Sequence, residues 1–243
     1  MKIPSIVKMV AVAALAIGFI PAHAQIVVPV NNASFDDVSL GNGNYTSARD
    51  QGVASAIPGW SFSGNGSNDA GEQWFNSSGD FINTSPLETS STGGPGGTMT
   101  STGNQAIYSF GGSHVFQDVG TILANTTYTL TVAIGNRASQ QGPSIFSLIN
   151  GIDPTGFVLA TSTGAEPTAG YFQDQTITFT TDALASGHLT IDLTSVGGQG
   201  QGIFDNVRLT ETAVPEPSTW ALMLGGLGLL AWGVHRRNGS ARI

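Results

Sequence analysis

The chain has 243 residues, no cysteine and a formal net charge of −8 at neutral pH. Between residues 25 and 214, three arginines and no lysine stand against 15 carboxylates, which gives this part a net charge of −12. Such a surface repels the phosphates of nucleic acids and anionic lipid headgroups, so nucleic acid is excluded as a partner. The lack of cysteine excludes disulfides, thiol catalysis and thiolate metal ligands.

Residues 1–24 have the three parts of a secretory signal peptide. Lys2 and Lys8 supply the positive region, and residues 9–20 form the apolar region. As a helix this apolar region measures about 18 Å, which is too short for a hydrocarbon core of about 30 Å. Residues 22–24 (AHA) form a small-x-small cleavage site. We expect signal peptidase to cut after Ala24 and the protein to be exported.

Residues 25–212 predict one all-β domain, an antiparallel jelly-roll β-sandwich. Apolar side chains at positions 128, 130, 132 and 134 alternate with threonine and alanine, which is the period of a half-buried strand. Similar short segments recur between clusters of turn residues, and no stretch keeps a helical period. The expected strands are residues 26–30, 114–119, 128–134, 145–149, 156–160, 176–180, 189–193 and 203–210. Residues 88–103, rich in Gly, Ser and Thr, predict a surface loop.

Two aromatic side chains are candidates for glycan binding, because sugar rings stack on flat apolar surfaces. Trp74 lies among polar residues in the stretch GEQWF, which favours an exposed position, and Tyr108 is the second candidate. Trp60 follows Ile-Pro-Gly and is expected in the core. The alternative for both candidates is burial, since large aromatic side chains dominate protein cores.

The sequence lacks the motifs of common enzyme classes, including G-x-S-x-G, H-E-x-x-H and the phosphate-binding loops. His114 and His188 are the only histidines between residues 25 and 214, and each lies in or beside an expected strand. A hydrogen-bonded structural role is the simpler interpretation of both. We therefore expect a protein that is not an enzyme, with a glycosidase carboxylate pair as the alternative.

The two ends of the domain look like the opening and closing strands of galactose-binding-type jelly rolls. The matching stretches are NNASFD at residues 31–36, IPGW at residues 57–60 and FDNVRL at residues 204–209. That class usually opens in N-G-x-F-E and contains many carbohydrate-binding modules. This sequence departs from the pattern with Ala33 in place of glycine and Asp36 in place of glutamate. The resemblance implies the fold more strongly than the function.

The same resemblance implies a structural calcium ion held by Asp36 and Asp205, with backbone carbonyls completing the oxygen shell. Regular alternation in the closing strand would place Ile203, Asp205, Val207 and Leu209 on one face. Asp205 would then point its carboxylate into an apolar layer, which is costly unless it is paired or bound to a cation. The alternative is that Asp205 lies at a strand end and caps a turn through hydrogen bonds.

The C-terminal segment, residues 213–243, has three parts in order. Pro215, Glu216 and Pro217 form a motif expected to stay extended and outside any helix. An apolar run of 15 residues follows at positions 220–234. It would measure about 22 Å as a helix, whereas a permanent span needs about 20 residues. Arg236 and Arg237 then match the positive-inside rule. The pattern predicts a short transmembrane helix that holds the domain outside the inner membrane.

This tripartite tail closely resembles the PEP-CTERM sorting signal of Gram-negative bacteria. In that family the transpeptidase exosortase recognises Pro-Glu-Pro and removes the tail. The resemblance therefore implies exosortase and signal peptidase as processing partners, and transient contact with the inner membrane. An ordinary C-terminal anchor is the alternative interpretation of the tail.

Members of the family are typically surface or matrix proteins of bacteria that secrete exopolysaccharide. The expected function is therefore a structural or glycan-binding role at the cell surface or in an exopolysaccharide biofilm matrix. A secreted glycan-active hydrolase that carries the same tail is the alternative.

Overall fold

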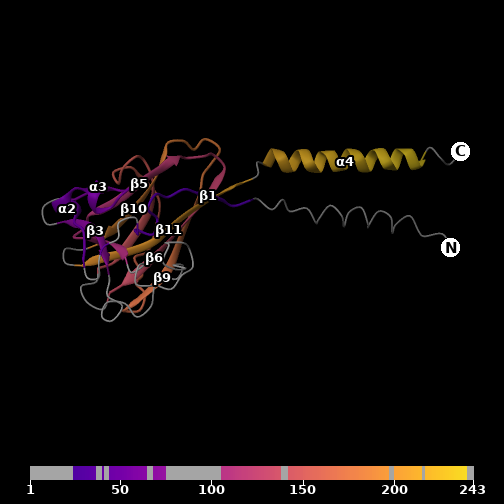
Figure 1. Ribbon diagram of the computed structural model, residues 1–243. Helices are drawn as coiled ribbons and strands as arrows, with labels where there is room; N and C mark the ends of the chain where they lie inside the picture. The colour runs from indigo at the N-terminus through magenta and orange to yellow at the C-terminus, as the bar shows by residue number, and fades with distance from the viewer. Residues whose placement is uncertain are drawn as a thin grey trace.

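Two antiparallel sheets pack face to face in a β-sandwich, and one long helix follows them (Figure 1). The computed structural model describes residues 24–36, 40, 44–64, 68–74, 105–137, 142–196, 200–214 and 217–239. The six-stranded sheet has the order β3-β4-β11-β6-β9, with β1 also paired to β11, and the five-stranded sheet has the order β2-β5-β10-β7-β8. The predicted all-β jelly-roll sandwich is confirmed.

The strands of the six-stranded sheet are β1 (Ile26–Val28), β3 (Asp69–Trp74), β4 (Gln105–Phe110), β6 (Thr126–Asn136), β9 (Tyr171–Thr180) and β11 (Gln201–Ala213). Those of the five-stranded sheet are β2 (Ser61–Ser63), β5 (His114–Thr121), β7 (Ser144–Asn150), β8 (Phe157–Thr161) and β10 (His188–Ser195). The helices are α2 (Ala48–Gln51), α3 (Val53–Ala56) and α4 (Pro217–Gly239).

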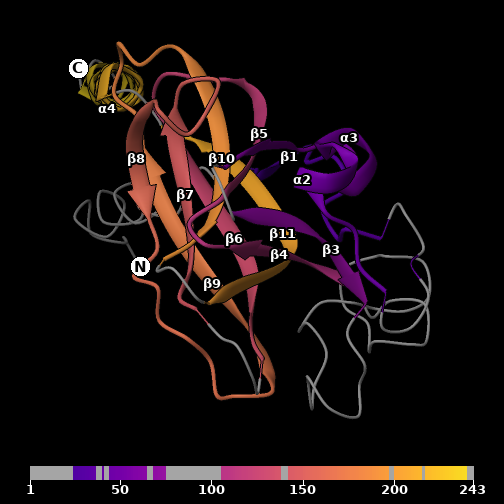
Figure 2. The same ribbon diagram turned by 90° about the vertical axis from the view of Figure 1, so that its left-hand side faces the viewer.

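The main hydrophobic core lies between the two sheets. Strand β6 sends Tyr128, Leu130, Val132 and Ile134 into this core, as the alternating pattern predicts. Buried apolar residues of β5, β7 and β10 face them from the other sheet. Figure 2 shows the two layers, with α2 and α3 beside β3. Trp60 is buried in this core, as expected.

The sequence pattern missed strands β2, β3 and β4. Strand β4 is buried on both of its faces, so its residues show no alternation between apolar and polar types. Strand β3 carries the buried polar side chains of Asp69 and Glu72, which resemble those of a surface loop in the sequence. Both strands are stabilised by contacts with distant parts of the chain, which a local pattern does not report.

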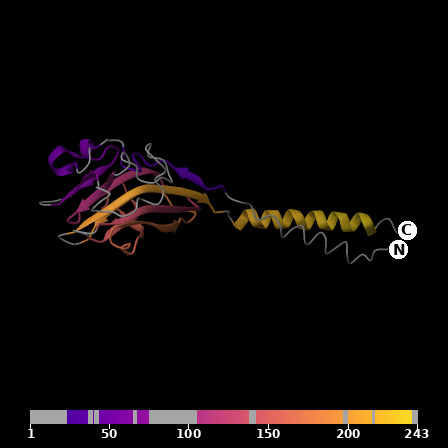
Figure 3. The same cartoon turned by 60° about the horizontal axis from the view of Figure 1, so that its bottom comes forward.

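The expected C-terminal helix is present as α4, which extends from one end of the sandwich (Figure 3). Its apolar run contains Gly225, Gly226, Gly228 and Gly233, which add little apolar surface. Within the described parts of the chain, no helix combines the length and apolar character needed to cross a membrane, so the expected transmembrane helix is not supported. Residues 1–23 and 88–103, with the predicted signal peptide core and surface loop, lie outside the described residues.

Candidate functional site

A second apolar cluster lies on the face of the six-stranded sheet that points away from the main core. Neighbouring residues of a strand point to opposite faces, so Ile107 and Phe204 enter the main core while Tyr108 and Ile203 do not. We call the second set the outer cluster, and its members are Ala106, Tyr108, Ala133, Phe172 and Ile203. All five are buried, so this face of the sheet holds a packed apolar patch.

A glycine allows the outer cluster to pack closely on the sheet. A Cβ atom at Gly135 in β6 would lie 2.7 Å from Cε1 of Phe172 and 3.0 Å from Cγ2 of Ile203. Both distances are shorter than an ordinary van der Waals contact. The bare backbone of Gly135 therefore gives the Phe172 ring its place against the strand.

Asp205 shares this outer face with the cluster. It lies opposite Ala133 in the β11–β6 ladder, and residues directly opposite each other point to the same face. The Asp205 side chain is buried, and its Oδ1 accepts a hydrogen bond of 2.7 Å from the backbone N–H of Asn206. The bond is local, as the alternative expected, but Asp205 lies inside β11 and not at a strand end.

A β-bulge directly follows Asp205. The β11–β6 register shifts between Asp205 and Arg208, and Asn206 has a φ of 46°. Val207 and Leu209 consequently return to the main core, while Ile203 stays in the outer cluster. Ile203 therefore shares a face with Asp205 as predicted, whereas the prediction that Val207 and Leu209 also share it is wrong, because the bulge interrupts the alternation.

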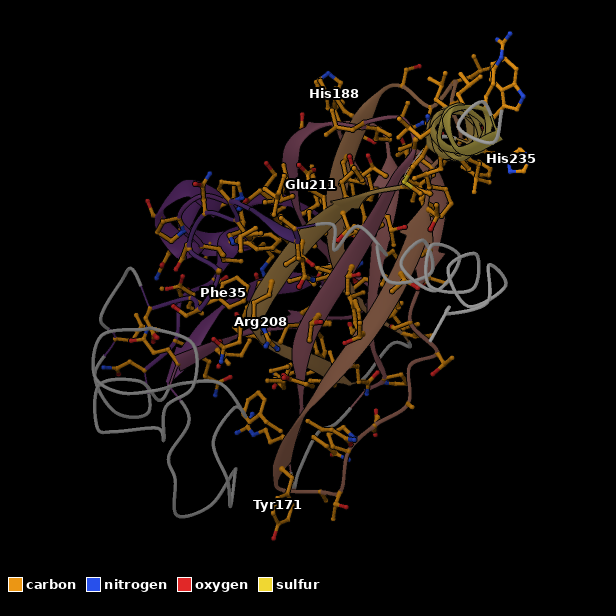
Figure 4. All side chains as sticks on the ribbon, turned by 90° about the vertical axis from the view of Figure 1, so that its right-hand side faces the viewer. Phe35, Tyr171, His188, Arg208, Glu211 and His235 are labelled. Carbon is orange, nitrogen blue, oxygen red and sulfur yellow. The ribbon has the colours of Figure 1, made fainter. Side chains whose placement is uncertain are left out.

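An ion pair lies beside the bulge on the outer face. One guanidinium nitrogen of Arg208 is 2.7 Å from Oδ2 of Asp174 in β9, and both side chains are about one-third exposed. Nε of Arg208 also donates to the carbonyl of Asn206 over 3.1 Å. In Figure 4, Arg208 lies between the two ends of the sandwich marked by His188 and Tyr171. This pair gives the outer face charged groups that solvent can reach.

The hydroxyl of Tyr108 is held by a polar network at the edge of the outer cluster. It lies 2.8 Å from the carbonyl oxygen of Thr46 and 3.2 Å from Oδ2 of Asp69. Asp69 also accepts hydrogen bonds from the hydroxyl of Ser47 and the backbone N–H of Arg49. Burial, reinforced by the charge of Asp69, raises the pKa of Tyr108, so the phenol stays protonated and donates.

For neither glycan-binding candidate does the described structure show an aromatic ring exposed to solvent. Tyr108 is only 4% exposed, so its ring belongs to the packed cluster. Trp74 is the last residue of β3, and its side chain lies outside the described residues. A role of either residue in glycan binding stays a prediction.

The two segments that were expected to share a calcium ion lie against each other. The backbone N–H of Val207 donates to the carbonyl of Ala33 over 2.9 Å. Phe35 is buried in the main core, with its ring centroid 5.3 Å from that of Trp60. Both carboxylate oxygens of Asp36 and Oδ2 of Asp205 are inaccessible to solvent. The oxygen-rich chemistry of these segments fits calcium.

Among the residues with described positions, no group of three or more His, Cys, Asp or Glu side chains is placed to hold a metal. A calcium ion at Asp36 and Asp205 would therefore depend on backbone carbonyls as further ligands, as the sequence prediction requires. The site stays a prediction.

Both histidines of the domain are hydrogen-bonded to aspartates across the β5–β10 ladder. Nδ1 of His114 lies 3.0 Å from each carboxylate oxygen of Asp192, and Nδ1 of His188 lies 2.8 Å from Oδ2 of Asp118. The bond to Asp192 raises the pKa of His114. Both histidines are hydrogen-bonded, as the sequence analysis expected, although the sequence did not identify their partners.

The sorting residues are partly described. Pro217 is the first residue of α4, so the prediction that it stays outside the helix is wrong. The first turn of a helix accepts proline because the N–H groups there have no intrahelical partner. The guanidinium of Arg236 lies 5.5 Å from the ring centroid of Trp232. Pro215, Glu216 and the side chain of Arg237 lie outside the described residues.

The outer face therefore combines a packed apolar cluster with aromatic rings, a buried carboxylate and a partly exposed ion pair. The five side chains of the outer cluster are at most 4% exposed, so the ion pair is the part of this site that solvent reaches. A carboxyl group such as that of Asp205 can exchange a proton with a substrate that reaches it.

Two family models match the chain. The HpiC1-like model, described as HpiC1 cyclase, matches residues 26–210, and the PEP-CTERM protein-sorting motif matches residues 213–237. No curated protein sequence matches the chain.

Solved cyclase structures share the fold. A cyclase from Fischerella sp. TAU is 20% identical, with a TM-score of 0.59 over 79% of this chain and 100% of its own. The Stig cyclase Fisc from Fischerella sp. TAU, solved in complex with (3Z)-3-(1-methyl-2-pyrrolidinylidene)-3H-indole, is 23% identical, with a TM-score of 0.58 over the same shares. The tandem CBM22 domains of Paenibacillus barcinonensis Xyn10C are more distant, at 11% identity and a TM-score of 0.46 over 81% of this chain and 49% of theirs.

Proposed function

Because the chain belongs to the HpiC1-like cyclase family and ends in a PEP-CTERM sorting motif, we propose that it is an exported surface or matrix protein that binds exopolysaccharide glycan. The observation that carries this proposal is the sorting motif, which begins at the last residue of β11. Exosortase would remove the tail and leave the jelly-roll domain in the matrix. The domain would act by binding and not by catalysis.

The outer face is the proposed glycan-binding surface. Sugars present apolar C–H faces and many hydroxyl groups, so their binding sites combine apolar side chains with hydrogen-bonding groups. The Asp174–Arg208 pair supplies partly exposed donors and acceptors, and the buried outer cluster would supply the apolar side chains once a ligand displaces the chain that covers them. The net charge of −12 between residues 25 and 214 favours a neutral or cationic glycan over an acidic one.

Binding can be tested by affinity electrophoresis of the secreted chain in gels that contain exopolysaccharide from the producing bacterium. We expect Arg208→Gln to weaken retardation roughly tenfold, because a charged hydrogen bond contributes about 1.5–3 kcal/mol. Arg49→Gln is the matched control, since Arg49 also forms an ion pair but lies on α2. Equal retardation of the two variants would contradict the proposed surface.

A second function, proton-transfer catalysis, is favoured by one observation. Asp205 is buried on the same face as Tyr108 and Phe172, in a chain whose family model is described as a cyclase. A carboxylic acid in apolar surroundings can donate its proton to an unsaturated substrate, and the carboxylate can take a proton back after ring closure. The substrate would be an aromatic compound with an unsaturated side chain.

Asp205→Asn separates the two functions. Indole compounds with an unsaturated side chain are incubated with the wild-type protein and the variant, and products are followed by mass spectrometry. Ring closure by the wild type alone supports catalysis at Asp205. Retained polysaccharide binding with no product, and no release of reducing ends, supports a protein that only binds.

A further inference from the structure

One end of the sandwich carries most of the exposed large apolar side chains that are described in the domain. Leu123 lies in the β5–β6 turn, Ile152 in the β7–β8 turn and Leu184 in the β9–β10 turn. Strand pairing places these turns together, because Thr121 lies opposite His188, and Leu189 lies opposite Asn150.

The two termini of the domain leave at this same end. Ile26 in β1 pairs with Glu211 near the end of β11. Figure 4 shows His188 at the end from which α4 leaves, and Tyr171 at the opposite end. We call the exposed apolar side chains of this end the apolar rim, and we define it as Val27, Leu123, Ile152, Phe157, Leu184 and Val214.

The apolar rim is held in ordered turns. Leu184 is 90% exposed, yet its backbone N–H bonds to Oδ1 of Asp182 over 2.8 Å. Phe157 is 75% exposed at the start of β8, after a turn in which Oδ1 of Asp153 accepts from the N–H of Thr155. Side chains held out in this way leave apolar surface in water, and several of them gathered at one end of a domain can together form an interaction surface.

Helix α4 leaves the domain at the same end as the apolar rim. Strand β11 ends at Ala213 and α4 begins at Pro217, so four Cα–Cα steps, at most about 14 Å, separate them. Leu222, Leu224 and Leu229 of α4 are exposed. Figures 1 and 3 show α4 extending from this end of the sandwich, so an apolar phase that covers its leucines would lie near the apolar rim.

We propose that the apolar rim docks on the surface of a bilayer of neutral phospholipid while the chain still carries its C-terminal helix. Neutral lipid fits because these turns carry Asp153 and Asp182, and Asp118 lies near the end of β5 beside them, and their carboxylates repel anionic headgroups. The rim would enter the headgroup region, while the outer face stays free to bind its ligand. This docking does not depend on glycan binding.

The absence of native cysteine permits a direct test on the full chain that still carries α4. Leu184→Cys is labelled with an environment-sensitive fluorophore, and Val196→Cys, which is exposed at the opposite end, is the matched control. With phosphatidylcholine vesicles we expect a blue shift at position 184 and none at 196, with quenching at 184 by brominated lipid. The same response at both positions, or no response at 184, overturns the proposal.

A second pair of variants tests whether the rim adds to vesicle binding. Leu184→Asp should lower the vesicle-bound fraction roughly tenfold, whereas Val196→Asp should leave it unchanged. Both side chains are exposed, so neither substitution removes a core contact. Equal binding by both variants would mean that α4 alone binds lipid and would overturn the proposal. A third outcome would also overturn the proposal. If the spectrum of the fluorophore at position 184 changes with protein concentration in the absence of lipid, a second copy of the chain covers the rim.

Discussion

Replacing Gly71 by alanine should destabilise the domain strongly. A Cβ atom at Gly71 would lie 2.1 Å from the carbonyl oxygen of Thr46, whereas ordinary contact begins at 3.4 Å, so this peptide group must move by about 1.3 Å. Thr46 makes five hydrogen bonds with Glu72, Ala56 and Tyr108, and two of them share the single hydroxyl proton of Thr46, so four donor groups take part. At about 1 kcal/mol for each donor group, their loss would lower the free energy of unfolding by about 4 kcal/mol.

Urea unfolding followed by tryptophan fluorescence measures this effect, because the buried Trp60 contributes to the signal. With a slope of about 2 kcal/mol/M, the midpoint of Gly71→Ala should fall by about 2 M. Tyr108→Phe is the control, since it removes one donor group, the hydroxyl that bonds to Thr46 and Asp69, without moving Thr46, and its midpoint should fall by about 0.5 M. If Gly71→Ala shifts the midpoint no more than Tyr108→Phe does, the close approach between Gly71 and the carbonyl of Thr46 is refuted.

Three further predictions concern metal, pH and sorting. EDTA should lower the melting temperature and calcium should restore it in the wild type and in Asp50→Ala, but not in Asp205→Ala, because an ion at a hundredfold excess over its Kd adds about 2.7 kcal/mol to the folded state. An unchanged wild-type melting curve in EDTA would exclude the calcium site. The bond to Asp192 raises the pKa of His114 above its ordinary value of 6.5, so the pair stabilises the fold below pH 6.5 and loses this contribution as the pH rises through the raised pKa. The difference in urea midpoint between wild type and His114→Gln should therefore be larger at about pH 5.5 than at about pH 9. Equal differences at the two pH values would contradict a raised pKa of His114. Glu216→Ala should leave the C-terminal tail attached, since exosortase must read Pro-Glu-Pro, and mass spectrometry of released wild-type protein that still ends at Ile243 would count against this sorting.

Local sequence patterns predict those strands that have one apolar and one polar face. Strand β6 is such a strand, because its threonines alternate with side chains of the main core. Strand β4 gave no such signal, since Ile107 enters the main core while Ala106 and Tyr108 enter the outer cluster. A strand that is apolar on both faces has no period of two, and only its partners determine its conformation.

The candidate site could be predicted in part. Asp205 was recognisable because a carboxylate within an apolar strand is unusual. The change of face after Asp205 could not be predicted from the sequence, because the bulge depends on Asn206 and on contact between Val207 and the distant Ala33. The ion pair of Arg208 with Asp174 likewise joins two strands whose register no local pattern reports.

The last strand of the chain is also an interior strand of its sheet. Strand β11 lies between β4 and β6 and also pairs with β1, which is the first strand. The six-stranded sheet consequently cannot close before residues 201–213 have left the export channel, and its long-range pairing makes this closure the slow step of folding. Because export runs from the N-terminus, the domain would cross as an open chain and fold only when the sorting motif, which starts at residue 213, reaches the membrane. Folding of the domain and recognition of its tail by exosortase are therefore expected within the same short interval of export.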